Sequence, residues 1–177
     1  FVNLGLRDHD LLAASDYEGA LLRCHHALTA VQGAVYRFEG TVNKFLMDDK
    51  GSTLIAVWGL PPHAHEDDPT RSCLAAIDLC SALADLGLAG SVGITTGVAF
   101  CGVVGTRTRR EYSVLGDMVN LSARLMQLAC TKNGGVICDA TTVHLARRGM
   151  EFEQLTSVKV KGKADLIDVF HPYTEEG

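Results

Sequence analysis

Strand-like and helix-like patterns alternate along this chain of 177 residues, and that alternation limits its fold more than any other feature. Residues 17–31 place apolar side chains on one side at helical spacing, which predicts an amphipathic helix. Residues 34–47 and 52–58 are instead rich in β-branched and aromatic side chains, which favours strands. Gly51 stands between these two runs and suits the left-handed conformation of a short hairpin loop, so we expect the runs to pair antiparallel.

A second helix is predicted downstream of the hairpin. It starts at Asp67 or Asp68, shortly before a proline, and Gly87 ends it after about Leu86. Residues 91–104 follow and are almost all apolar or glycine, as expected of one long strand buried on both faces. We interpret its glycines as positions of close packing, because the Gly-Lys-Ser/Thr ending of a phosphate loop does not follow them.

The rest of the chain continues the alternation, and Asp117 is expected to cap a third helix. This mixed order predicts an α+β fold: a ferredoxin-like βαββαβ core with added αβ elements, its sheet covered by helices on one face. We expect one domain over 1–177, and the strand-like start at Phe1 indicates a chain that begins inside a domain. The remaining strands are expected at 111–115, 134–138, 151–155, 158–160 and 166–173, with a short helix at 140–148.

Composition argues against several classes of partner. The formal charge of −5 and the isoelectric point near 5.8 provide no broad basic field, so neither a nucleic acid nor an anionic membrane is an expected partner. No apolar run approaches the ~20 residues that a membrane-spanning helix needs. The six cysteines are scattered without the paired spacing of a zinc site, which favours reduced thiols and a cytoplasmic setting.

One stretch carries candidate chemistry. Residues 110–125 read Arg-Glu-Tyr-Ser-Val-Leu-Gly-Asp-Met-Val-Asn-Leu-Ser-Ala-Arg-Leu. Asn120 and Arg124 are four residues apart on the predicted helix, so both side chains leave the same face. A planar amide beside a guanidinium can hold a sugar and a phosphate together. The spacing alone is equally compatible with a surface pair that makes ordinary contacts.

This stretch resembles the most recognisable motif of the class III adenylyl and guanylyl cyclases. Residues 93–105 resemble the family's Gly-Ile-His-Thr-Gly strand, and residues 160–163 resemble its C-terminal Lys-Gly motif. The resemblance therefore covers essentially the whole chain. It is closest to the second cyclase domain of the bicarbonate-responsive soluble adenylyl cyclases, through Phe1-Val2-Asn3-Leu4, Asn43-Lys44, Met47, Asp49-Lys50-Gly51 and Phe100-Cys101-Gly102.

The resemblance implies a head-to-tail pair of domains in which each active site takes residues from both. One domain supplies the metal ligands, and the other recognises the base. The two Asp positions that hold Mg²⁺ or Mn²⁺ in a metal-bearing domain are occupied here by Asn3 and Asp48. Asn3 is neutral, and two divalent ions on a triphosphate need a carboxylate pair. The metals are thus expected mainly on a partner cyclase domain, in the same chain or another, with Asp48 in a degenerate site or a hairpin turn.

The same resemblance implies an intact base-binding half. Lys44 matches the position whose ammonium reaches a ring nitrogen of adenine, and Ser113 matches a residue that accepts from the exocyclic amine. Val114 is implied to line the base pocket, and ATP is the implied nucleotide. The other implied roles are ribose positioning by Asn120, contact with the α-phosphate by Arg124 and polyphosphate binding by Lys161.

Two functions stay open on this reasoning. One is half of an adenylyl cyclase that makes cyclic AMP and pyrophosphate with a partner domain and is inactive or very weak alone. The alternative is a noncatalytic regulatory or dimerisation module, which the neutral Asn3 favours. The resemblance also implies bicarbonate as an effector near Met47, whereas the other interpretation of Met47 is as core filler.

Overall fold

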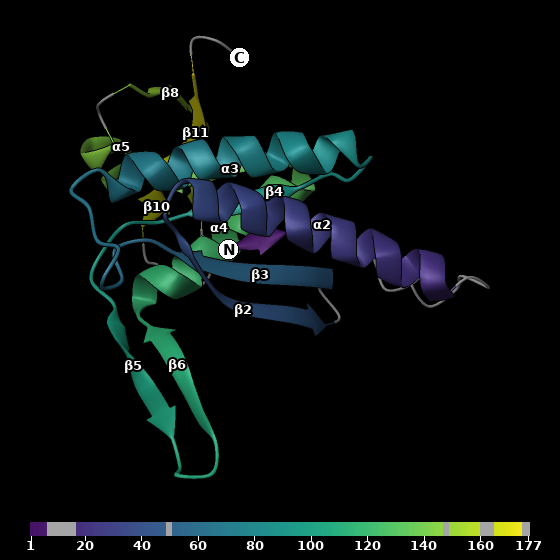
Figure 1. Cartoon of the computed structure of the whole chain (residues 1–177). Helices are drawn as coiled ribbons and strands as arrows, with labels where there is room; N and C mark the ends of the chain where they lie inside the picture. The colour runs from purple at the N-terminus through teal and green to yellow at the C-terminus, as the bar shows by residue number, and fades with distance from the viewer. Residues whose placement is uncertain (7–16, 49–50, 147–148, 160–164, 175–177) are drawn as a thin grey trace.

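The computed structural model of the chain describes residues 1–6, 17–48, 51–146, 149–159 and 165–174 (Figure 1). Among the helices of these residues, none combines the length and the apolarity that crossing a bilayer requires. The helices are α2 (Tyr17–Arg37), α3 (Asp68–Asp85), α4 (Asp117–Thr131) and α5 (Ala140–Leu145). The strands are β1 (Val2–Asn3), β2 (Thr41–Asp48), β3 (Gly51–Val57), β4 (Ser91–Ile94), β5 (Phe100–Gly105), β6 (Arg110–Leu115), β7 (Gly135–Asp139), β8 (Glu151–Gln154), β9 (Val158–Lys159), β10 (Leu166–Ile167) and β11 (Val169–Tyr173).

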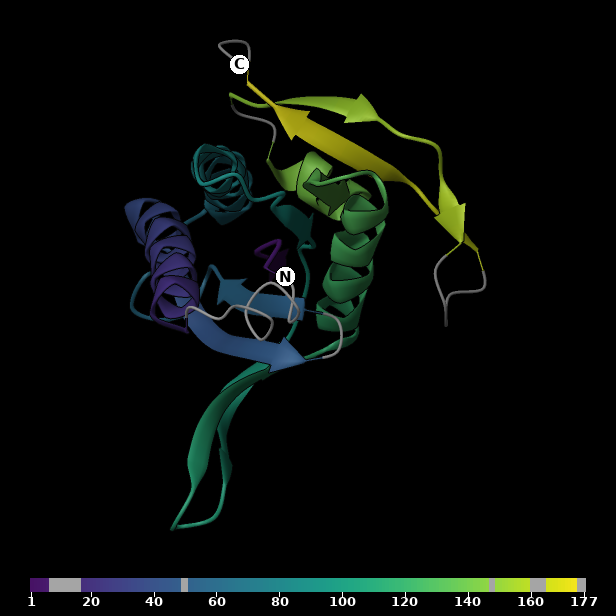
Figure 2. The same cartoon turned by 90° about the vertical axis from the view of Figure 1, so that its right-hand side faces the viewer.

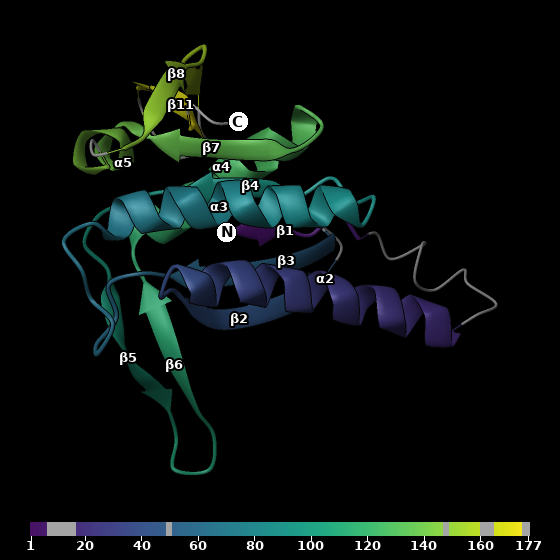
Figure 3. The same ribbon diagram turned by 45° about the horizontal axis from the view of Figure 1, so that its top comes forward.

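Seven strands form the central sheet, in the order β2-β3-β1-β4-β7-β11-β8. The pairing of β4 with β7 is parallel, whereas β2 with β3 and β1 with both β3 and β4 are antiparallel. Strands β5 and β6 form a separate two-stranded ribbon that extends away from the body of the molecule (Figures 1 and 3). We call this ribbon, residues 100–115, the arm. The predicted α+β architecture and the antiparallel β2–β3 hairpin are confirmed.

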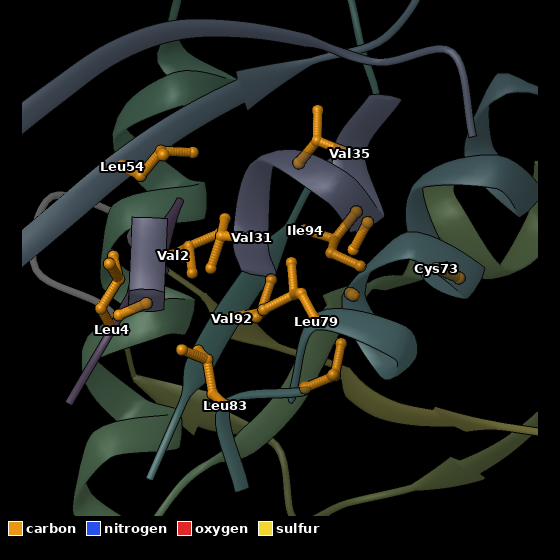
Figure 4. Packing of buried hydrophobic residues seen from close by; sticks show 14 of the residues in the cluster. Val2, Leu4, Val31, Val35, Leu54, Cys73, Leu79, Leu83, Val92 and Ile94 are labelled. Carbon is orange, nitrogen blue, oxygen red and sulfur yellow. The ribbon is translucent and has the colours of Figure 1, made fainter. Parts of the chain in front are cut away.

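The main core lies between the sheet and the helices α2 and α3 (Figure 4). Helix α2 buries Ala27, Val31, Ala34 and Val35, whose spacing of three to four residues keeps them on one face. From α3, Leu79 packs into the same cluster. Each fully buried aliphatic side chain of this kind stabilises the fold by about 1.5–3 kcal/mol relative to its exposed state.

Helices cover both faces of the sheet, so the prediction of helices on one face was wrong (Figure 2). In β4, Val92 and Ile94 point into the core with α2 and α3. Gly93 lies between them and faces the opposite side, where the backbone of α4 approaches it. A second cluster of α4 side chains with Ile137 of β7 forms the core on that face. Strands β4 and β7 are therefore buried on both faces, while the periodicity of α4 alone does not tell which face it covers.

Residues 34–37 are helical, so the strand predicted over 34–47 starts too early. The buried positions of α2 continue through Ala34 and Val35, and this burial outweighs the β-branched character of the segment. Helix α2 ends at Arg37, and the amide of Gly40 in the turn after it donates to the carbonyl of Val35 at 2.9 Å. A Cβ at Gly40 would lie 2.5 Å from the Trp58 ring, so only glycine fits there.

The single strand predicted over 91–104 is two strands with different surroundings. Strand β4 is wholly buried, whereas most of β5 is exposed on the arm. Between them Thr95 donates its hydroxyl to the carbonyl of Met118 at 2.7 Å, which ties the departing chain to α4. The apolar residues of 98–104 therefore indicate an exposed ribbon and not a continued core strand.

The start of α4 also differs from the expectation. Gly116 occupies the N-cap position, and Asp117 is the first helical residue. The chain approaches itself closely at this point, because a Cβ on Gly116 would lie 3.3 Å from the carbonyl oxygen of Val98.

Helix α3 agrees with its prediction, and Gly87 after it has a φ of 72°, in the left-handed region.

Gly93→Ala is expected to destabilise the protein by about 3 kcal/mol, because the new Cβ would lie 2.1 Å from the Ser122 carbonyl oxygen and 2.3 Å from the Met126 nitrogen. Both are backbone atoms of α4, so the helix itself would have to move. Urea unfolding measures the change. Gly33→Ala is the matched control: no heavy atom lies within 4 Å of its Cβ, and alanine in a helix interior should stabilise by about 0.5–1 kcal/mol. Equal stability of the two variants would contradict this packing.

Candidate functional site

Lys44 and the arm meet beside the edge of the central sheet. Lys44 lies on β2 opposite Ile55 of β3, and its side chain is 39% exposed. Its ammonium forms an ion pair with the carboxylate of Glu111 on β6. The pair joins two strands that belong to different sheets. Glu111 was not among the residues that the sequence indicated, because nothing local relates it to Lys44.

Ser113 shares a face of the arm with Glu111. The two residues are two positions apart on β6, so their side chains point the same way. Since Lys44 contacts Glu111, its ammonium lies on the face that also carries the Ser113 hydroxyl. The residue directly across from Ser113 is Gly102, which contributes no side chain on that face. The structure thus brings the two predicted base-recognising residues to one face of the arm.

The Lys44–Glu111 pair shifts the titration of the carboxyl group. The hydrogen bond from Lys44 holds the pKa of Glu111 below its ordinary value, and the charges of Lys44 and Arg109 act in the same direction. Both side chains are substantially exposed, so water screens the attraction and its contribution to folding stability is small. The pair therefore orients Lys44 more than it stabilises the fold.

Val114 lies on the opposite face of β6, where it borders a cavity of about 170 Å³. Strands β3 and β4 and helices α3 and α4 contribute most of the other lining residues. Pockets that enclose drug-sized ligands have volumes of about 300–1,000 Å³. The cavity lining includes Val114 but not Lys44, Ser113, Asn120 or Arg124.

Asn120 and Arg124 lie on the side of α4 away from its buried residues. Asn120 is exposed and Arg124 is half-buried, while Leu125 and Ala129 pack into the second core cluster. The spacing of four residues places the two polar side chains on one face, as predicted. Within the described part of the chain the Arg124 guanidinium takes part in no ion pair, so its charge is not neutralised there.

The implied metal positions do not form a two-metal site in the described residues. The side-chain oxygen of Asn3 accepts a hydrogen bond from the Gly5 amide at 2.8 Å, which is a local turn contact. Asp48 pairs with Gly51 in the β2–β3 register, and its side chain lies outside the described atoms. Over residues 1–6, 17–48, 51–146, 149–159 and 165–174 there is no cluster of three His, Cys, Asp or Glu side chains that could hold a metal ion. A neutral amide already engaged in a turn does not fit a ligand shared by two divalent cations.

The structure tests the interpretation of Met47 but does not describe Lys161. Met47 lies on β2 opposite Ser52 and is 44% exposed, so its interpretation as core filler was wrong. Lys161 falls outside the described residues. Asn43 is a residue that the chemistry of the motif did not single out, and its side chain donates to the backbone carbonyl of Tyr112 at 2.9 Å.

Replacing Lys44 should raise the pKa of Glu111 toward its ordinary value. The folded-state pKa is lowered by Lys44, so the pair favours the folded state above the unfolded pKa of about 4.3 and loses this effect as pH falls through the folded pKa. Carboxyl ¹³C NMR titration of Lys44→Met measures the change. Lys132→Met, after the end of α4, is the charge-matched control and should leave Glu111 unchanged. A titration curve of Glu111 that is identical in both variants would contradict the ion pair.

Comparison with known proteins identifies the family of this chain. Residues 35–171 match the family described as adenylate and guanylate cyclase catalytic domain. Adenylate cyclase type 10 of Homo sapiens is 34% identical over 169 residues, which cover 93% of this chain and 10% of that protein. The Rattus norvegicus adenylate cyclase type 10 is 31% identical over 174 residues, 96% of this chain and 10% of that protein. The chain thus spans about a tenth of the length of these relatives.

Solved structures agree with the fold. The adenylyl cyclase CyaB from P. aeruginosa superposes with a TM-score of 0.82 at 18% identity, covering 94% of this chain and 88% of that one. The guanylate cyclase domain of RhGC from Catenaria anguillulae, in complex with GTP, gives a TM-score of 0.80 at 14% identity, with coverages of 98% and 93%. At these identities the likeness shows the fold alone, and it confirms the predicted cyclase-like architecture. The match over residues 35–171 and the curated relatives show more: this chain belongs to the adenylate and guanylate cyclase catalytic domain family, the class III cyclases.

Proposed function

We propose that this domain is the base-binding and transition-state half of an adenylyl cyclase, which converts ATP to cyclic AMP and pyrophosphate together with a metal-bearing partner domain. The observation that carries the proposal is the placement of the Lys44 ammonium and the Ser113 hydroxyl on one face of the arm. The names of the curated relatives, adenylate cyclase type 10, support the adenylyl activity.

The two side chains match the hydrogen-bonding edge of adenine. Adenine offers a ring nitrogen that accepts and an exocyclic amine that donates. Lys44 donates only, and it has three N–H groups, so the bond to Glu111 leaves others for the base. The Ser113 hydroxyl can accept from the amine. Guanine reverses this edge and would place a ring N–H against the ammonium, leaving donors unpaired, so ATP is favoured over GTP.

In the proposed reaction the ribose 3′ oxygen attacks the α-phosphorus. The new oxygen–phosphorus bond closes the ring, the bond to the pyrophosphate oxygen breaks, and the 3′ proton is lost. Asn120 positions the ribose, and Arg124 meets the charge that develops at the α-phosphate. Lys161 is proposed to bind the polyphosphate. Mg²⁺ or Mn²⁺ would be held mainly by the partner domain, since Asn3 of this chain already accepts the Gly5 amide.

The exposed apolar side chains of the arm support the proposal of a partner domain. Phe100, Val103, Tyr112 and Leu115 of the arm are exposed, and the arm extends away from the body (Figure 1). Two-stranded ribbons with apolar side chains are rarely stable without a packing surface. The cavity beside Val114, about 170 Å³, is also small for a nucleotide. A head-to-tail pair would cover the arm and complete the pocket, with bicarbonate as a proposed effector near the exposed Met47.

A noncatalytic regulatory module is the second candidate, and the turn contact of Asn3 favours it. Mixing the purified chain with a metal-bearing cyclase domain distinguishes the two. We expect cyclic AMP from ATP and Mg²⁺ in the mixture and almost none from either partner alone. Absence of product in the mixture, with nucleotide binding also absent, would favour the regulatory module. Repeating the assay with and without bicarbonate tests the effector, and unchanged activity would remove it.

Arg124→Ala is expected to lower kcat of the assembled pair about a hundred- to thousandfold, the effect of one preorganised transition-state contact. KM for ATP should change little, because the contact forms as charge develops. Steady-state kinetics measures both constants. Gln127→Ala is the matched control, since Gln127 is exposed on the same helix one turn further on. A loss of kcat below threefold in Arg124→Ala would exclude this role.

A further inference from the structure

Strand β2 contains a bulge at Asn43. Val42 pairs with Ala56 of β3, and Lys44 pairs with the adjacent Ile55. The register therefore shifts between Val42 and Lys44, and Asn43 is the extra residue on the bulged strand.

The bulge decides which way Lys44 points. Val42 and Ala56 share a face and pack against the main core. In a regular strand Lys44, two residues after Val42, would point to that same face. With the extra residue, Lys44 instead pairs with Ile55, whose side chain points to the opposite face from Ala56. Asn43 thus turns Lys44 from the core face toward the arm.

The Asn43 side chain also holds the arm. Its Nδ2 donates to the backbone carbonyl oxygen of Tyr112 at 2.9 Å. Strands β2 and β6 belong to different sheets, so no backbone ladder sets their spacing. Asn43 immediately precedes Lys44, and Tyr112 immediately precedes Ser113. One hydrogen bond therefore connects the neighbours of both base-recognising residues.

The neighbouring Lys44–Glu111 pair is less suited to holding the arm beside β2. It is an exposed ion pair, which water screens, and it uses the ammonium that has to reach the base. The Asn43 bond uses a backbone carbonyl and a side chain that take no part in base recognition. It can persist unchanged while nucleotide binds.

We propose that Asn43 is a positioning residue, which sets the spacing between Lys44 and Ser113 and thereby the discrimination of adenine from guanine. The inference rests on the proposed function. Two hydrogen bonds to one base edge require their donor and acceptor to be held within about 0.5 Å. The arm is a two-stranded ribbon, marginal by itself, so its place beside β2 depends on contacts such as this one.

The test uses Asn43→Asp and Asn43→Ala in the chain assembled with its metal-bearing partner domain. Aspartate keeps the size of the side chain but offers an oxygen to the Tyr112 carbonyl, so the bond is lost. We expect KM for ATP to rise about fivefold and the ATP-over-GTP ratio of kcat/KM to fall by a similar factor, the scale of one hydrogen bond. The kcat for ATP should stay within about twofold, because base contacts act equally on bound substrate and transition state.

Thr131→Val is the matched control. It removes a side-chain donor to a backbone carbonyl, that of Leu128, at the far end of α4. Both kinetic constants should be unchanged in this variant. Hydrogen exchange without nucleotide gives an independent measure: the β6 amides should exchange faster in Asn43→Asp than in the unmodified chain, and not in Thr131→Val.

The outcomes separate the inference from the function it rests on. If the unmodified pair makes cyclic AMP and Asn43→Asp keeps its selectivity, the positioning role is overturned and the proposed function stands. An equal loss of selectivity in Thr131→Val would also overturn it, because general destabilisation would then explain the effect. If the unmodified pair makes no cyclic AMP, the proposed function fails, and the inference fails with it.

Discussion

The contact between Gly93 of β4 and the backbone of α4 determines how the rest of the molecule is arranged. A side chain at this position would lie 2.1 Å from the Ser122 carbonyl, so the helix can rest on the sheet only because β4 carries a glycine there. Helix α4 follows β6 directly and presents Asn120 and Arg124 on its outer side. The same packing therefore places the root of the arm and the two residues proposed for the ribose and the α-phosphate.

The body and the arm have different physical characters. The body is a sheet buried between helices, in which close packing allows little movement. The arm is exposed, and its described links to β2 are the side-chain contacts of Asn43 and Lys44. The proposed base recognition combines a residue from each part. Its geometry thus depends on a few polar contacts, whereas the position of Arg124 depends on the core.

The proposed division of labour between two domains has a simple electrostatic basis. The chain presents an ammonium and a guanidinium on its accessible surface, while Asn3 holds a neutral amide in a local turn. Positive groups suit a polyphosphate and a purine ring nitrogen, but divalent ions need carboxylates. In the proposed function a complementary domain supplies the carboxylates and covers the exposed apolar side chains of the arm.

By itself the sequence determined the features that depend on near neighbours. The β2–β3 hairpin around Gly51, the helix α3 with its end at Gly87, and the shared face of Asn120 and Arg124 all follow from local periodicity and glycine conformation. The cyclase motif could likewise be recognised from the sequence, because its residues are contiguous.

Only the tertiary structure decided where those elements lie in relation to one another. Residues 91–104 divide into a buried strand and an exposed one, α4 covers the second face of the sheet, and Lys44 turns toward Glu111 through a bulge. Apolar composition does not distinguish a core from an exposed arm that a partner could cover, and a hydrogen bond between residues 69 apart leaves no local pattern. Such contacts are selected by the packing of the whole chain, which is why they appear only once it is folded.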